Sequence, residues 1–422
     1  MALQFIDQKG APGADIGSAE RRLIRSHVMK GKNAGRPRRS TKRQAALLYP
    51  IRRVLTWSGP SVVVAPAARP RQLLWSDLSL TSFPQQLDSE STKLMHRWFF
   101  DISDELFPPQ FCCKFDIIKS IWVNCILQDE AYFHSTLAIS ASYVEFCQRK
   151  PSVSPKTLHH IAKAYELVNV KLSGPDSISD SAIAAVVALV MYQQVHNQHS
   201  AGLVHLHGLF QMIQLRGGIF RLLRENRALA LKALRVDAEL ALQNGSATIF
   251  GGDDLRNAVL PDSEAFKAIR ENLPNAAPAE SPYFMLEVVA FSKVLDTIDQ
   301  KGSSRLDPLG FMEIMIWLLY HLIEASQLGQ LRSSVSEGQY EAVANLGMLA
   351  FMTTLLPEYG RVPDRSNYPL LCRRLKSAIQ DLHFTSTLEE NRESWLLLLW
   401  ALFMGGHLGS LELCGYSELN RA

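Results

Sequence analysis

The hydrophobic pattern of the chain centres on two apolar stretches joined by a short polar turn. The first, Ala182–Tyr192, is apolar at almost every position and follows a Ser/Asp-rich segment of the kind that caps a helix N-terminus. In the second, apolar side chains recur at steps of three and four: Leu203, Leu206, Phe210 and Ile213. That spacing predicts an amphipathic helix, so the two stretches are expected to pair as the centre of a helical domain.

The ends of the second stretch carry helix signals as well. Ser200 is a candidate N-cap, and Arg216 falls in the last turn, where a cation opposes the negative end of the helix dipole. The pair Gly217 and Gly218 supplies residues able to adopt positive φ as a stop. Inside the helix, Gly208 is expected to leave room for the close approach of a neighbouring element.

The rest of the body has the same helical periodicity, and no strand-like alternation stands out. Asp129 and Asp307 are placed to cap two of the helices, and the segment after Pro308 is apolar on nearly all sides, which predicts a buried helix. We predict an all-α, irregular multi-helix bundle of paired helices over residues 89–422, preceded by a disordered basic arm and linker over residues 1–88. The other expected helices are about Ser91–Leu106, Phe115–Gln128, Glu130–Gln148, Pro155–Leu172, Asn226–Gln243 (amphipathic), one after Ser281, Gly338–Leu356, Tyr368–Leu382 and Glu389–Leu413.

Charge is distributed unevenly along the chain. Residues 1–76 hold 15 Lys and Arg against 3 Asp and Glu, and no acidic residue occurs from Arg21 to Ser76. The densest part contains five cations within eight residues: Arg36, Arg38, Arg39, Lys42 and Arg43. Such a run is typical of nuclear-import signals and of arms that contact phosphates, and Gly35–Pro37 resembles the core of an AT-hook. A solvated basic linker with only an import role is an equally weighted alternative.

No catalytic or cofactor signature emerges. Phosphate-binding glycine motifs and the serine-hydrolase elbow are absent from the sequence, and the six cysteines form no C-x-x-C pair. Histidines 196, 199, 205 and 207 crowd the central turn, but no acidic residue lies between Ala182 and Gly218 to complete a metal site. The runs Ala182–Tyr192 and Trp395–Met404 are shorter than the ~20 residues of a membrane span. We therefore expect no enzyme activity, cofactor, metal ion or membrane contact.

Two segments carry a resemblance to a known family. The helix with its stop, in which the family motif falls on His205, Leu206, Gly208, Arg216, Gly217 and Gly218, resembles the "H-L-x-G … R-G-G" pattern of fungal-specific transcription factors. Phe133–Tyr143 is similar to a helix earlier in their regulatory region, and Ile24–Asn33 to a basic motif that opens members without a zinc cluster. Many members bind DNA through six closely spaced N-terminal cysteines, whereas residues 1–111 contain none here. The resemblance thus implies a member without that module.

Three functions follow, in decreasing order of support. The first is a nuclear transcriptional regulator, controlling metabolic or secondary-metabolite genes as the resemblance implies. Its expected partners are DNA, through the basic arm, and proteins of the transcription machinery or a DNA-binding regulator. The second is a helical scaffold or adaptor with no direct DNA binding. The third, far behind, is an enzyme with a site around the central histidines.

Overall fold

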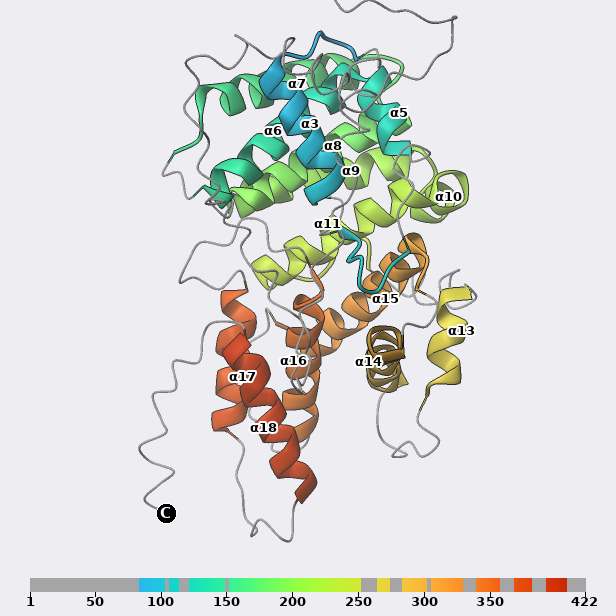
Figure 1. The fold of residues 1–422 in the computed structure, drawn as a ribbon, viewed down its shortest axis with the longest axis vertical. Helices are drawn as coiled ribbons and strands as arrows, with labels where there is room; N and C mark the ends of the chain where they lie inside the picture. Colours follow the sequence, from blue (N-terminus) through green and yellow to red (C-terminus); the bar gives the residue numbers. More distant parts are fainter. Residues whose placement is uncertain are drawn as a thin grey trace, which may run out of the picture. The chain divides into compact units, whose positions relative to one another are not determined.

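The computed structural model describes residues 83–102, 106–113, 121–148, 152–251, 264–273, 283–301, 305–328, 339–356, 368–381 and 392–407, all within the compact unit Thr56–Ala422 (Figure 1). Over these ranges the chain forms 14 α-helices, one π-helical segment and no strand; an isolated bridge joins Cys112 to Leu306. The predicted all-α fold is confirmed. The predicted arm, residues 1–82 of it, lies outside the described residues.

The first group of helices surrounds the predicted central pair. Helix α6 packs against both α7 and α8. Helix α8 packs along α9, the next helix in the chain, to which a short turn joins it. Every side chain of α8 from Ala182 to Val195 is buried, which confirms the buried helix expected there. The elements are α3 (Ser89–Arg97), η1 (Trp98–Ile102), α5 (Ile121–Gln128), α6 (Glu130–Cys147), α7 (Pro155–Leu172), α8 (Asp180–Val195), α9 (His199–Leu215), α10 (Ile219–Glu225) and α11 (Arg227–Asn244).

A second group follows in the chain and is built on α15. This helix contacts α11, α14 and α16, while α16 in turn contacts α17 and α18. The elements are α13 (Glu264–Glu271), α14 (Tyr283–Lys301), α15 (Pro308–Ser326), α16 (Gln339–Thr353), α17 (Pro369–Gln380) and α18 (Arg392–His407). Among the described residues, α15 is the helix long and apolar enough to cross a membrane, yet two-thirds of it is buried inside the protein. It is the core helix that the sequence predicts.

Helix α11 joins the two groups, and here the prediction of an amphipathic helix was wrong. All side chains from Leu229 to Leu242 are buried, because α11 contacts α8 and α9 as well as α15 and α17 (Figure 1). Its charged residues find partners inside the protein. Arg235 pairs with Glu239 at 2.7 Å, and Asp237 accepts hydrogen bonds from Ile249 N, Phe250 N and Tyr320 Oη.

Several helix ends agree with the sequence signals. Asp129 caps α6 by accepting from Tyr132 N, and Asp307 caps α15 by accepting from Gly310 N. Gly245 ends α11 in the left-handed region at φ 66°. Two short helices, α10 and α13, were not predicted, and the first predicted helix changes to π-helical geometry at Trp98. The predicted starts at Phe115 and Ser281 and the end at Leu413 lie outside the described residues.

Two expectations for α9 were wrong. Ser200 is not the N-cap: Asn197 adopts φ 54°, Gln198 N donates to Gln193 O, and the helix therefore already begins at His199. Gly208 does not admit a close neighbour, since nothing lies within 4 Å of where its Cβ would stand. A contact of this kind occurs six residues earlier, where a Cβ on Gly202 would meet Leu240 Cδ1 at 3.4 Å.

Candidate functional site

The family-like stop of α9 forms an electrostatic clamp around Arg216. Its guanidinium pairs with Asp180 at the start of α8, and with Glu225 at 3.0 Å at the end of α10. The same group donates to Ile178 O at 3.4 Å. Asn226 Nδ2 donates to the other oxygen of Asp180 at 2.6 Å, so one carboxylate links three segments. Both carboxyl partners hold the pKa of Arg216 above its ordinary value.

The two glycines turn the chain so that this clamp can close. Gly217 and Gly218 have φ of 106° and 90°, a region that favours glycine, and Gly218 is the N-cap of α10. A Cβ on Gly217 would also stand 2.8 Å from Arg221 Cδ. The predicted positive-φ stop is confirmed. Of the other motif residues, Leu206 is buried in the core, and His205 stacks on Tyr165 with ring centroids 5.6 Å apart. The motif therefore holds α8, α9 and α10 together.

Arg216→Met should destabilise the protein more than Arg216→Lys. Methionine removes the charge and every hydrogen bond to Asp180 and Glu225, whereas lysine keeps one charge but loses the two-sided fork. Because both carboxylates are partly exposed, we expect about 1–2 kcal/mol for Met and about half of that for Lys. Urea unfolding followed by circular dichroism measures the difference. Equal stability of wild type and Arg216→Met would show that the clamp contributes nothing.

The histidines of the central turn do not gather at one point. His196 Nε2 lies 2.8 Å from Ser142 Oγ on α6, whereas His205 faces α7 and His207 is exposed. Burial lowers the pKa of His196, His199 and His205, which favours neutral rings. Across the described ranges, no three His, Cys, Asp or Glu side chains are grouped to hold a metal ion.

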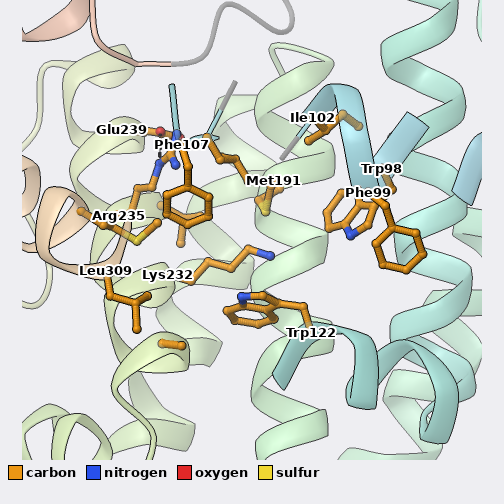
Figure 2. A pocket seen from close by; sticks show the side chains of 14 residues that line it. Trp98, Phe99, Ile102, Phe107, Trp122, Met191, Lys232, Arg235, Glu239 and Leu309 are labelled. Atoms are coloured by element: carbon orange, nitrogen blue, oxygen red, sulfur yellow. Dashed lines mark hydrogen bonds and ion pairs between the residues drawn. The ribbon is translucent and has the colours of Figure 1, made fainter. Parts of the chain in front are cut away.

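A cavity of about 40 Å³ lies between α11 and the helices around it (Figure 2). Its walls are mostly aromatic and aliphatic, and α11 supplies its charged groups. The lining residues are Trp98, Phe99, Ile102, Leu106, Phe107, Trp122, Met191, Ala228, Lys232, Arg235, Val236, Glu239, Leu309 and Met312. This site was not predicted from the sequence. Positions 232, 235 and 239 share one face of α11, and charged side chains at such spacing are typical of a solvated face.

Lys232 is the chemically distinctive residue of the cavity. Its side chain extends from α11 over the face of Trp122, with Nζ 4.0 Å from the ring centroid (Figure 2). Trp98 and Tyr132 stand further out, at 5.2 and 5.8 Å, and Nζ donates to Tyr132 Oη at 3.3 Å. Burial, reinforced by the nearby Arg235 charge, lowers the pKa of Lys232 to about 7. Cation–π contacts offset only part of the cost of burying the ammonium.

The sequence-predicted basic cluster cannot be placed beside either site. Arg36, Arg38, Arg39, Lys42 and Arg43 all lie outside the described residues, as does the family-like segment Ile24–Asn33. The other two family-like segments are described, and both form helices: Phe133–Tyr143 lies within α6, and the second segment spans α9 and its glycine stop.

The fold and these sites define an all-helical domain in which a charged central helix borders a mostly apolar cavity. Residues 109–238 match the family model of the fungal specific transcription factor domain, which confirms the family resemblance over that segment. The matched segment contains the Arg216 clamp, its glycine turn and Lys232. No curated protein and no solved structure matches the chain.

Proposed function

We propose that the protein is a nuclear transcriptional regulator whose regulatory domain spans residues 89–422. One observation carries the proposal: the match of residues 109–238 to a transcription factor domain, which supports a role in transcriptional regulation rather than catalysis. By extension from that family, its target genes belong to metabolism or secondary metabolism. In this proposal it uses no zinc cluster, which the absence of cysteine from residues 1–111 supports.

In this proposal the basic arm is the part that contacts DNA. An arm with five cations in eight residues gives salt-sensitive affinity through phosphates, with little reading of base edges. Proteins of the transcription machinery, or a DNA-binding regulator, then supply target selection. The alternative is a helical adaptor that binds such a regulator and no DNA, and the cysteine-free N-terminal region favours it equally.

Replacing Arg36, Arg38, Arg39, Lys42 and Arg43 with Ala in the full chain tests the proposal. We expect DNA affinity near physiological salt to fall at least about tenfold, and the slope of log K against log salt to become less negative by about 4. Fluorescence anisotropy of a labelled duplex across a salt series measures both quantities. In cells, the same variant should lose nuclear accumulation.

A charge-matched control removes five exposed cations from the helical body instead: Lys93, Arg224, Arg270, Arg373 and Lys376. The control variant should keep the wild-type salt slope and localisation. If the arm variant keeps both its DNA affinity and its nuclear localisation, the regulator proposal is wrong. If wild type itself binds no DNA but enters the nucleus, the adaptor reading takes its place.

A further inference from the structure

Lys232 is a buried cation with almost no hydrogen-bonding partners. Lys232 is 6% exposed, and its Nζ makes one hydrogen bond, to Tyr132 Oη. An ammonium has three N–H donors. Within the described ranges no carboxylate lies in ion-pairing distance of it. Two N–H groups of the Lys232 ammonium therefore face the aromatic cavity without an acceptor among the described residues. Burying a charge in this way costs free energy unless an anion enters the cavity.

The other charged groups of the cavity compensate each other. Arg235 Nε donates to Glu239 Oε1 at 2.7 Å, one turn further along α11. Both side chains are buried, at 8% and 7% exposure, so the pair is held together inside the protein. In Figure 2 this pair stands beside Phe107, and Lys232 is directed toward Trp122. Among the described residues that line it, the cavity thus presents one positive charge without a carboxylate partner, which a single anionic group would neutralise.

The size of the cavity limits what can carry that anion. A water needs roughly 10–15 Å³, and a dry cavity of about 150 Å³ holds benzene. At about 40 Å³, the space holds a carboxylate group with one or two carbon atoms, and because Trp122, Ala228 and Leu309 in its walls are only half-buried, the end of a slightly longer chain can extend beyond it. Its apolar walls, with Met191, Phe107 and Leu309 facing Lys232 (Figure 2), favour a short hydrocarbon part over a polar one.

We propose that this cavity is a binding site for a short-chain monocarboxylate, of the size of acetate to butyrate. Its carboxylate pairs with Lys232 Nζ, and its alkyl chain packs against Met191, Phe107 and Leu309. Binding goes beyond the proposed function and does not depend on it. Only an effect of the bound acid on transcription rests on the regulator proposal.

The environment of Lys232 adds a pH dependence to this binding. Four titratable groups face or adjoin its amine: Arg235 and Glu239 on α11, Cys125 on α5 and Tyr132 on α6. Because the pKa of Lys232 is about 7 in the empty cavity, the amine is largely neutral at pH 8.5 and must take up a proton to pair with an anion. Affinity for the carboxylate should therefore fall about tenfold per pH unit above 7.

Calorimetric titration of the full chain with butyrate, with saturation-transfer NMR on the butyrate methyl group as a second readout, tests the proposal. At pH 6.5 we expect a dissociation constant of about 1 mM or below, and no binding of butyramide, which has the same shape but no charge. At pH 8.5 binding should be weaker by more than tenfold. Butyramide binding as tight as butyrate, or no butyrate binding at pH 6.5, would overturn the proposal.

Variants distinguish this cavity from other sites. Lys232→Met replaces the cation with an apolar chain of similar length. Proteins often tolerate such a replacement of a buried charge without loss of stability, and this variant should not bind butyrate. Ala228→Leu fills the cavity while keeping Lys232, and should also abolish binding. Lys376→Met, on the exposed face of α17, is the matched control and should bind as wild type does. The variant lacking the five arm cations should bind butyrate normally, so failure of the arm proposal and of this one are separable.

Discussion

Asp237→Ala is expected to lower the free energy of unfolding by about 3–5 kcal/mol. The carboxylate is 1% exposed and accepts three hydrogen bonds. Ile249 N donates to Oδ1 at 2.9 Å, Phe250 N donates to Oδ2 at 2.9 Å, and Tyr320 Oη donates to Oδ2 at 2.7 Å. Alanine leaves the backbone amides of Ile249 and Phe250 without their acceptor, whereas Tyr320 Oη keeps a hydrogen bond to Leu234 O, so the loss comes mainly from the two amides and the emptied carboxylate site.

The number of hydrogen bonds lost at Asp237 should determine how much stability each variant loses. Tyr320→Phe removes one donor and leaves Asp237 bonded to both backbone amides, so we expect only about 1–2 kcal/mol. Asp237→Asn keeps the shape of the side chain but replaces one carboxylate oxygen with an amide NH2 group, which faces a hydrogen-bond donor and cannot accept from it. It should therefore fall between the other two variants.

Urea unfolding of the three variants and wild type, monitored by circular dichroism at pH 7, measures this order. Native-state hydrogen exchange gives a local readout, because the amides of Ile249 and Phe250 should lose protection in Asp237→Ala and keep it in Tyr320→Phe. An Asp237→Ala protein as stable as Tyr320→Phe would mean that the backbone amides find other acceptors, and the carboxylate would not be what anchors residues 246–251 to α11.

Asp237 also shows which part of the fold could be predicted from the sequence. Helix α15 was predicted to be buried, and α8 to lie at the centre of the domain, because an uninterrupted apolar pattern requires burial on all sides. Helix α11 has the same burial but carries Lys232, Arg235, Asp237 and Glu239, whose charges imitate a solvent-exposed face. The partners of Asp237 and Lys232 lie far away in the chain: Tyr320 for Asp237 and Tyr132 for Lys232. Hydrophobic periodicity contains no information on such pairs.

Local signals were reliable where a single residue determines the backbone. Gly217 and Gly218 adopt positive φ as expected, and Asp129 caps α6 because an Asx side chain reaches the backbone N–H three residues on. The Ser200 prediction failed because the turn before α9 closes through backbone hydrogen bonds rather than a side chain. Arg216 was expected only to oppose a helix dipole, and its two carboxylate partners became visible only in three dimensions.

Acidification is expected to remove about 3 kcal/mol of stability between pH 6.5 and 4 through a buried histidine pair on α6 and α7. His134 Nδ1 and His160 Nδ1 lie 2.9 Å apart, so one donates and the other accepts, which requires at least one neutral ring. The Nε2 atoms of both rings are buried without a hydrogen-bond partner. Burial lowers the pKa of His134, and lowers that of His160 to about 4, helped by the charges of His134, His159 and Lys156.

The direction of this pH effect on stability follows from comparing the folded and the unfolded protein. In the unfolded chain a histidine takes up its proton near pH 6.5, whereas in the folded protein His160 stays neutral until about pH 4. Between these values the unfolded state binds more protons, so stability is fully present above pH 6.5 and decreases as pH falls toward 4. Asp88 and Glu130, which face the pair from α3's cap and from α6, oppose the shift without reversing it.

His160→Gln should flatten this profile, because glutamine can still hydrogen-bond to His134 Nδ1 but does not titrate. His207 on α9 is exposed and is not among the groups that act on this pair, so His207→Gln is the matched control that should keep the wild-type slope. Unfolding free energies at pH 7, 6, 5 and 4.5 give the comparison, and taking differences between variants cancels the carboxylates that titrate in the same range. Parallel profiles for His160→Gln and wild type would show that the pair does not carry the acid sensitivity. A flattened profile would show that the histidine pair in the α6–α7 contact carries this part of the acid sensitivity.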